Sequence, residues 1–157
     1  MLLHDDDVAR TTNGAGRIAE IPLAEARRLD AGHHFGAAGA HPWRGQGARI
    51  PTLEEAFEAL PGVRFNLEIK ESAPGVADRT LETIARAGRA GLTLLAAEKD
   101  AIMATVREAV ARTGIQVAVG ACVGDVVRCV RAALDGSPAP AGVMALQIPA
   151  DFGGRPV

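Results

Sequence analysis

The sequence predicts an α/β protein with a parallel sheet, and two observations support this prediction. After residue 50, segments with helical periodicity alternate with short segments that are rich in apolar and β-branched residues. This alternation is typical of parallel sheets whose strands are joined by right-handed helical crossovers. Apolar residues make up 48% of the 157 residues, which is enough to build a sizeable core.

The expected elements follow one another along the chain. Thr52 and Glu55 have the spacing of a capping box, and the Pro61-Gly62 pair would end the helix that they begin. Before them, residues 5–51 are rich in Gly and polar side chains, and Pro22 and Gly32 would enclose one short helix. We expect helices near 23–31, 52–60, 77–90, 101–112 and 125–134, and strands near 63–71, 92–97, 115–122 and 143–148.

The first of these strands has an unusual polar face. Its side chains alternate with period two, so Phe65, Leu67 and Ile69 share one face, and Glu68 and Lys70 share the other. Strands of parallel sheets are usually apolar on both faces, so a polar face indicates a functional reason. A carboxylate suits a hard metal cation and an ammonium suits a phosphate, and both would lie at the carboxyl end of the strand. Such an edge is where α/β folds place active sites.

Composition excludes several classes of function. The formal net charge of −2 and the 3% aromatic content argue against a nucleic-acid-binding surface. No apolar run approaches the roughly 20 residues of a membrane span, and no signal-peptide pattern opens the chain. Localisation stays open, with the cytoplasm favoured. Cys122 and Cys129 are interpreted as reduced thiols.

Short motifs in register carry a resemblance to a known family. They are Leu2–Asp5, Arg10–Gly16, Leu29–Gly32, Ile50–Glu55 and Asn66–Lys70. In order and spacing they closely resemble the glycerophosphodiester phosphodiesterase family. The resemblance implies a TIM (β/α)8 barrel with an inserted segment after the second strand, which residues 5–51 would contain. Since a closed barrel needs about 250 residues, we expect one incomplete barrel domain over residues 1–157, with about strands 2–6.

The resemblance also implies a reaction and a set of site residues. The family hydrolyses glycerophosphodiesters, which are small molecules, to glycerol 3-phosphate and an alcohol with the help of a divalent cation such as Mg²⁺ or Ca²⁺. In this sequence His4 matches a catalytic histidine, Glu68 matches a metal ligand, and Lys70 matches a lysine that contacts phosphate. A histidine near neutral pH can protonate a leaving alkoxide, an effect worth about 10²–10⁴-fold in rate.

The sequence departs from the family pattern upstream of His4. The family carries a His-Arg pair and a Glu-x-Asp pair before that histidine, and residues 1–157 contain neither in that place. We expect a fragment that is itself poorly active. The alternatives are a catalytically inactive α/β scaffold, a phosphate-binding module, or an unrelated barrel enzyme acting on a phosphate ester.

Several residues keep two interpretations. Asp5 either orients His4 or begins a turn, and Glu68 and Lys70 could form a structural ion pair. The loop histidines are either incidental or part of a lid over the substrate; they are His33, His34 and His41.

Overall fold

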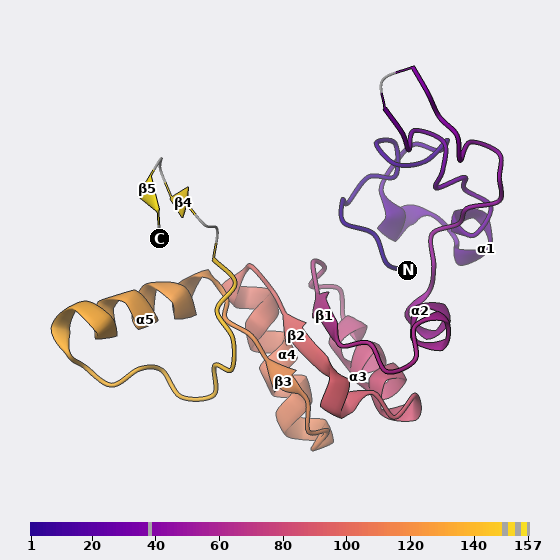
Figure 1. Ribbon diagram of the computed structural model, residues 1–157. Coiled ribbons are helices and arrows are strands. Elements are labelled where there is room, and N and C mark those ends of the chain that lie inside the picture. The colour runs from indigo at the N-terminus through magenta and orange to yellow at the C-terminus, as the bar shows by residue number, and fades with distance from the viewer. Residues whose placement is uncertain (38, 149–150, 153–154, 157) are drawn as a thin grey trace. The chain divides into compact units, whose positions relative to one another are not determined.

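The chain forms two compact units, Met1–Ala59 and Leu60–Val157 (Figure 1). The computed structural model describes residues 1–37, 39–148, 151–152 and 155–156. Among these residues, none of the helices has the length and apolar character that crossing a bilayer requires.

The first unit consists mainly of loops that are closed by hydrogen bonds. Its helical elements are η1 (Ile18–Glu20), α1 (Leu23–Ala26) and α2 (Leu53–Ala59). The predicted capping box at α2 is confirmed: the Thr52 amide donates to Glu55 Oε2 at 2.8 Å, and the Glu55 amide donates to Thr52 Oγ1 at 3.2 Å. Residues 1–3 form no strand, and the Leu2 amide instead donates to the Pro51 carbonyl oxygen at 2.9 Å.

The helix expected over 23–31 is shorter than predicted and ends at Ala26. Asp30 explains part of the difference, because its carboxylate accepts the amides of Gly32 at 3.0 Å and Gly45 at 2.8 Å. Short acidic side chains that bond to nearby backbone amides compete with helix formation in this way. The Asn13 side chain accepts the Asp30 amide at 2.7 Å, so Asp30 joins three parts of the loop.

The second unit contains the predicted parallel sheet. Its strands are β1 (Phe65–Glu68), β2 (Thr93–Ala96) and β3 (Ala118–Val119), in the order β1-β2-β3. The connecting elements are α3 (Val76–Arg86), η2 (Ala90–Leu92) and α4 (Asp100–Thr113), with α5 (Val123–Asp135) following β3. Parallel pairing brings Glu68 of β1 level with Ala96 of β2.

The hydrophobic core of this unit is formed by side chains of the sheet and of helices α3 and α4. Helices α3 and α4 pack against each other, as Figure 1 also shows. Fully buried apolar side chains come from α3, β2 and α4; they are Leu81, Ile84, Leu95, Met103 and Val106. The burial follows the helical spacing that the sequence shows, in which residues three and four apart share a face.

Four expected ranges in this unit are wrong. The strand expected over 63–71 spans only Phe65–Glu68. Helix α3 ends at Arg86, before Gly88, which adopts the left-handed conformation (φ 64°) that often follows a helix. The strand expected over 115–122 is paired only at Ala118–Val119. Residues 143–148 form no strand: they make only two backbone hydrogen bonds to the segment around β3, Met144 N to Val119 O and Ala121 N to Ala145 O.

Two short strands near the C-terminus were not expected from the sequence. They are β4 (Asp151–Phe152) and β5 (Arg155–Pro156), and they pair antiparallel. Each strand has only two residues, too few for period-two alternation to appear in the sequence.

Candidate functional site

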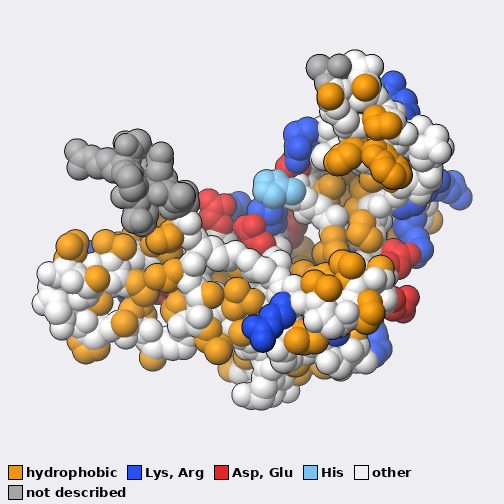
Figure 2. All heavy atoms as spheres, viewed as in Figure 1, with side chains coloured by type: hydrophobic (Ala, Val, Ile, Leu, Met, Phe, Trp, Pro, Cys, Tyr) orange, Lys and Arg blue, Asp and Glu red, His pale blue; other side chains and the backbone are white. Residues whose placement is uncertain are grey.

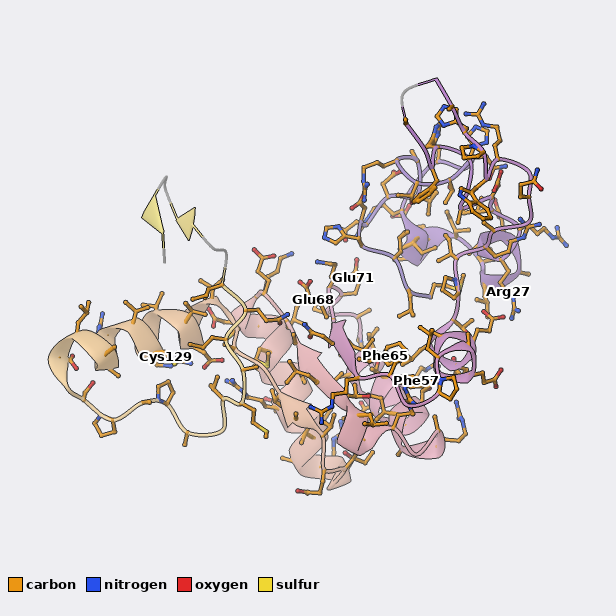
Figure 3. All side chains as sticks on the ribbon, viewed as in Figure 1. Arg27, Phe57, Phe65, Glu68, Glu71 and Cys129 are labelled. Carbon is orange, nitrogen blue, oxygen red and sulfur yellow. The ribbon has the colours of Figure 1, made fainter. Side chains whose placement is uncertain are left out.

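Glu68 and Lys70 lie together at the carboxyl end of β1. Lys70 Nζ donates to Glu68 Oε2 at 2.7 Å, and the side chains are 27% and 36% exposed, respectively. Figure 3 shows Glu68 with Glu71 at this same end of the strand. Because the carboxyl ends of parallel strands share one edge of the sheet, Glu68 stands on the edge where β2 and β3 also end.

The period-two pattern of β1 places these side chains as predicted. Ile69 is buried, whereas Asn66 and Glu68 are exposed. The Ile69 amide donates to the Ala96 carbonyl oxygen at 2.8 Å, so pairing with β2 continues one residue beyond the strand. The segment that carries Glu68 and Lys70 is therefore held by backbone bonds on both sides of Glu68.

His4 belongs to the first unit, whereas Glu68 and Lys70 belong to the second. Its side chain is 77% exposed, and Nδ1 lies 2.7 Å from Asp5 Oδ1. Asp5 is also held by Arg10, whose Nη2 donates to Asp5 Oδ1 at 3.0 Å and whose Nε donates to Oδ2. The hydrogen bonds from Arg10 and then from His4 lower the pKa of the Asp5 carboxyl well below its usual range.

The described residues do not by themselves fit a divalent cation. No group of three or more His, Cys, Asp or Glu side chains in that part of the chain could hold a metal ion. Glu68 contributes one carboxylate, which already accepts a hydrogen bond from Lys70. Hard cations such as Mg²⁺ and Ca²⁺ take six or more oxygen ligands, so Glu68 would be one ligand of a larger set.

The loop histidines form a cluster of rings without metal-site geometry. The rings of His33 and His34 meet edge to face at 4.6 Å between centroids, and those of His34 and His41 at 6.2 Å. Burial and then the Arg44 guanidinium lower the pKa of His33. Among the described residues these rings belong to no group that could hold a metal ion, and both interpretations, incidental loop residues and part of a lid, stay open.

A small cleft of about 140 Å³ lies elsewhere in the second unit, and neither Glu68 nor Lys70 lines it. It lies between the segment after β1 and helix α4, and its lining includes Glu71, Asp78 and Arg112. Arg112 Nη2 donates to Asp78 Oδ1 at 2.6 Å, so these two charged groups of the cleft already pair with each other.

The sequence does not predict the contact of Arg10 with Asp5. This pairing crosses five residues of irregular loop, and no periodicity signals such a contact. The motif Arg10–Gly16 marks the segment as unusual, but only the folded loop shows which side chain Arg10 meets.

Comparison with known proteins identifies the family. Residues 1–112 match the model of the glycerophosphoryl diester phosphodiesterase family. The chain belongs to this family. The resemblance found in the motifs is thereby confirmed.

Individual relatives agree with this assignment. The chain is 39% identical over 89 residues to a glycerophosphodiester phosphodiesterase of Caldanaerobacter subterraneus. The aligned region covers 54% of the chain and 34% of the relative. The chain is 36% identical over 76 residues to a glycerophosphodiester phosphodiesterase of Bacillus subtilis, covering 47% of the chain and 26% of the relative.

A solved structure shows the same fold. The glycerophosphoryl diester phosphodiesterase domain of an uncharacterized Mycobacterium tuberculosis protein superimposes with a TM-score of 0.72 at 22% identity. The match covers 88% of the chain and 50% of that domain's chain. The chain thus spans about a third or less of the two curated relatives named above and half of the solved structure.

Proposed function

We propose that this chain is part of a metal-dependent glycerophosphodiester phosphodiesterase, which releases glycerol 3-phosphate and an alcohol. The observation that carries the proposal is the family match over residues 1–112, because this range includes His4, Glu68 and Lys70. The substrate would be a small glycerophosphodiester.

In this proposal, Glu68 is the ligand that the chain contributes to a divalent cation, Mg²⁺ or Ca²⁺. Its position supports the assignment, since a partly exposed carboxylate at the carboxyl edge of a parallel sheet can reach a ligand there. A bound cation would neutralise charge on the phosphodiester. The further carboxylates of the family pattern would come from residues outside 1–157, and the chain would be about strands 2–6 of one barrel domain.

Lys70 and His4 would act on the phosphodiester itself. The Lys70 ammonium, which donates to Glu68, has two further protons that could meet anionic oxygens of a phosphate. The His4 ring is exposed and its Nε2 could carry a proton to the leaving alcohol. The two residues therefore differ in kind: Lys70 would bind charge throughout, and His4 would act as the bond breaks.

The proposal is tested on a longer version of the chain that also carries the His-Arg and Glu-x-Asp motifs of the family. We expect release of glycerol 3-phosphate from glycerophosphodiesters, loss of that activity in EDTA, and recovery on adding Mg²⁺ or Ca²⁺. Phosphate binding without any turnover, with or without cation, would favour the phosphate-binding module instead. The ion pair of Lys70 with Glu68 is the observation that keeps this second candidate in view.

A further inference from the structure

We propose that Asp5, clamped by Arg10, is a positioning residue that fixes the tautomer and orientation of His4. The inference rests on the proposed function for the task of His4, but the arrangement itself belongs to this chain. It assigns a role to two residues, Asp5 and Arg10, that do not need to touch the substrate.

The geometry of the carboxylate is the first argument. Asp5 Oδ1 accepts hydrogen bonds from His4 Nδ1 at 2.7 Å and from Arg10 Nη2 at 3.0 Å, and Oδ2 accepts from Arg10 Nε. A guanidinium that meets a carboxylate through two nitrogens sets the plane of that carboxylate. The direction of the bond to the histidine ring is therefore determined by Arg10 as well as by Asp5.

The fold of the loop is the second argument, because it brings Arg10 back to Asp5. The Val8 amide donates to the Gly16 carbonyl oxygen at 3.0 Å, and Thr12 Oγ1 donates to the Val8 carbonyl oxygen at 2.8 Å. Val8 and Thr12 are almost completely buried, at 0% and 1% exposure. The chain is thus anchored by a buried residue two positions before Arg10 and another two positions after it, although the Arg10 side chain lies at the surface.

The charge state is the third argument. The hydrogen bonds from Arg10 and His4 lower the pKa of Asp5, so its carboxyl is ionised throughout the neutral range. An ionised carboxylate only accepts hydrogen bonds, so the ring nitrogen that faces it must carry the proton. His4 Nδ1 then holds a proton in every state of the ring, and Nε2 is the nitrogen that changes.

This arrangement suits a general acid. With both nitrogens protonated, Nε2 gives its proton to the alkoxide oxygen as the bond from that oxygen to phosphorus breaks. The ring becomes neutral, and Nδ1 keeps its proton against Asp5, which remains ionised. In the other tautomer, the ring would present a protonated Nε2 in its neutral state and could not take a proton there.

Nitrogen NMR on the chain of 157 residues tests the inference without any activity. We expect neutral His4 to show a protonated Nδ1 and an unprotonated Nε2. Asp5→Asn should shift the ring toward the mixture of tautomers of a free imidazole, and Arg10→Gln should do so in part. Asp6→Asn is the matched control: it removes an exposed acid from the same loop and should leave the His4 spectrum unchanged. The Val8 amide, bonded to Gly16, reports whether each variant keeps the loop fold.

Kinetics on the longer version provide the second readout. Asp5→Asn should lower kcat by about 10–100-fold with little change in KM, the size of loss seen when a metal-ligating histidine loses its hydrogen-bond partner. If Asp5 acts through His4, adding Asp5→Asn to His4→Ala should cost little more than His4→Ala alone.

The outcomes separate the inference from the proposed function. A wild-type His4 with the tautomer mixture of a free imidazole, or fully additive losses in the double variant, would overturn the positioning role. A fixed tautomer in a longer protein that releases no glycerol 3-phosphate would instead support the positioning role and contradict the proposed function.

Discussion

The hydrogen bond from Lys70 to Glu68 at the end of β1 leaves two interpretations of Glu68, a structural ion pair and a metal ligand. Its 2.7 Å bond from Lys70 is compatible with a structural ion pair, but both side chains are more than a quarter exposed. Ion pairs exposed to solvent contribute about 0–1 kcal/mol to stability. As a structural ion pair, Glu68 and Lys70 would therefore contribute little to the free energy of unfolding. As a metal ligand, Glu68 should instead be needed for cation binding.

Glu68→Gln in the longer version should weaken divalent-cation binding and activity at limiting metal by at least tenfold. The change removes a charge and keeps the size of the side chain, so the free energy of unfolding should change by no more than about 1 kcal/mol. Glu82→Gln, at an exposed position of α3, is the matched control. Activity within a few-fold of wild type at limiting metal would show that Glu68 is not a ligand.

His4 and Lys70 should respond differently to the leaving group. His4→Ala should lower kcat on an alkyl glycerophosphodiester, and this loss should shrink on a nitrophenyl ester, whose leaving group needs no proton. Lys70→Ala should weaken both binding and rate on the two substrates alike, because a phosphate contact exists before and during bond breaking. The measurement is kcat and KM for each variant on each substrate. Equal losses for His4→Ala on both would remove the general-acid role.

At this scale, the sequence predicts faces better than it predicts contacts. Period two in β1 was enough to separate Ile69, which is buried, from Glu68, which is exposed. The clamp of Arg10 on Asp5 could not be predicted, because it depends on how a loop without periodicity returns on itself. The sequence therefore predicted the exposure of side chains on a regular strand, but it could not predict the contacts of Asp5 and Arg10 in the irregular loop.

At the scale of elements, the start of α5 is held by a buried charge. The side chain of Asp125 is 2% exposed and accepts hydrogen bonds from Arg107 Nη2 at 2.5 Å and Arg128 Nη2 at 2.5 Å. It also accepts the Cys122 amide at 3.0 Å, which closes the first turn of the helix. Burial raises the pKa of Asp125, but the hydrogen bonds from Arg107, Cys122 and Arg128 outweigh it and hold that pKa well below its usual range.

Removing this carboxylate should destabilise the second unit. Asp125→Ala leaves the Cys122 amide without its partner, and such a loss costs about 1–3 kcal/mol; the guanidinium groups of Arg107 and Arg128, 38% and 57% exposed, would turn to water instead. Denaturant unfolding measures the loss. Glu108→Ala, at an exposed position of α4, is the control, and an equal small effect in both variants would mean that the network contributes nothing.

The same group predicts a dependence of stability on pH. Because the folded pKa of Asp125 is depressed, its contribution is present above the unfolded value of about 3.9 and is lost as pH falls below it. Asp125→Asn should therefore show a weaker fall in stability below pH 4 than the wild-type chain. The free energy of unfolding of both proteins is measured at a series of acidic pH values. Equal slopes of this free energy against pH would contradict the assignment.

The two cysteines should differ in reactivity. Burial, with hydrogen bonds to Asp100 and Asp125, raises the pKa of the Cys122 thiol to about 11. Since only the thiolate attacks an alkylating reagent, Cys122 should resist iodoacetamide at pH 8, whereas the partly exposed Cys129 should react first. Mass spectrometry of the alkylated chain distinguishes them, and equal labelling of folded protein would contradict the burial of Cys122.

Elements were predictable where periodicity was long and caps were present. Helices α2, α4 and α5 lie within about two residues of their expected ranges. The strand expected over 143–148 does not form. An apolar run becomes a strand only when a neighbouring strand offers a continuous ladder of hydrogen bonds, and this segment makes only two backbone hydrogen bonds to the residues around β3. Met144 in that segment is 72% exposed, so burial does not stabilise it either.

At the scale of the whole molecule, the second unit exposes apolar surface and open strands. Residues of α5 spaced four, three and four apart are exposed along one stripe, which Figure 2 shows as hydrophobic; they are Val123, Val127, Val130 and Leu134. In the described part of the chain, the three-stranded sheet has β1 and β3 as edges, and the β3 edge is partly paired by the backbone hydrogen bonds of Met144 and Ala145. Open edges and apolar patches promote association between chains.

We propose that this chain holds part, and not all, of a glycerophosphodiester phosphodiesterase site. The most direct test is a coupled assay for released glycerol 3-phosphate, run side by side on purified residues 1–157 and on the longer version with both upstream motifs. We expect release near background from residues 1–157, with His4, Glu68 and Lys70 present, and metal-dependent release from the longer version. Turnover at an ordinary enzymatic rate by residues 1–157 alone would show that these residues hold a complete site and would contradict the proposal.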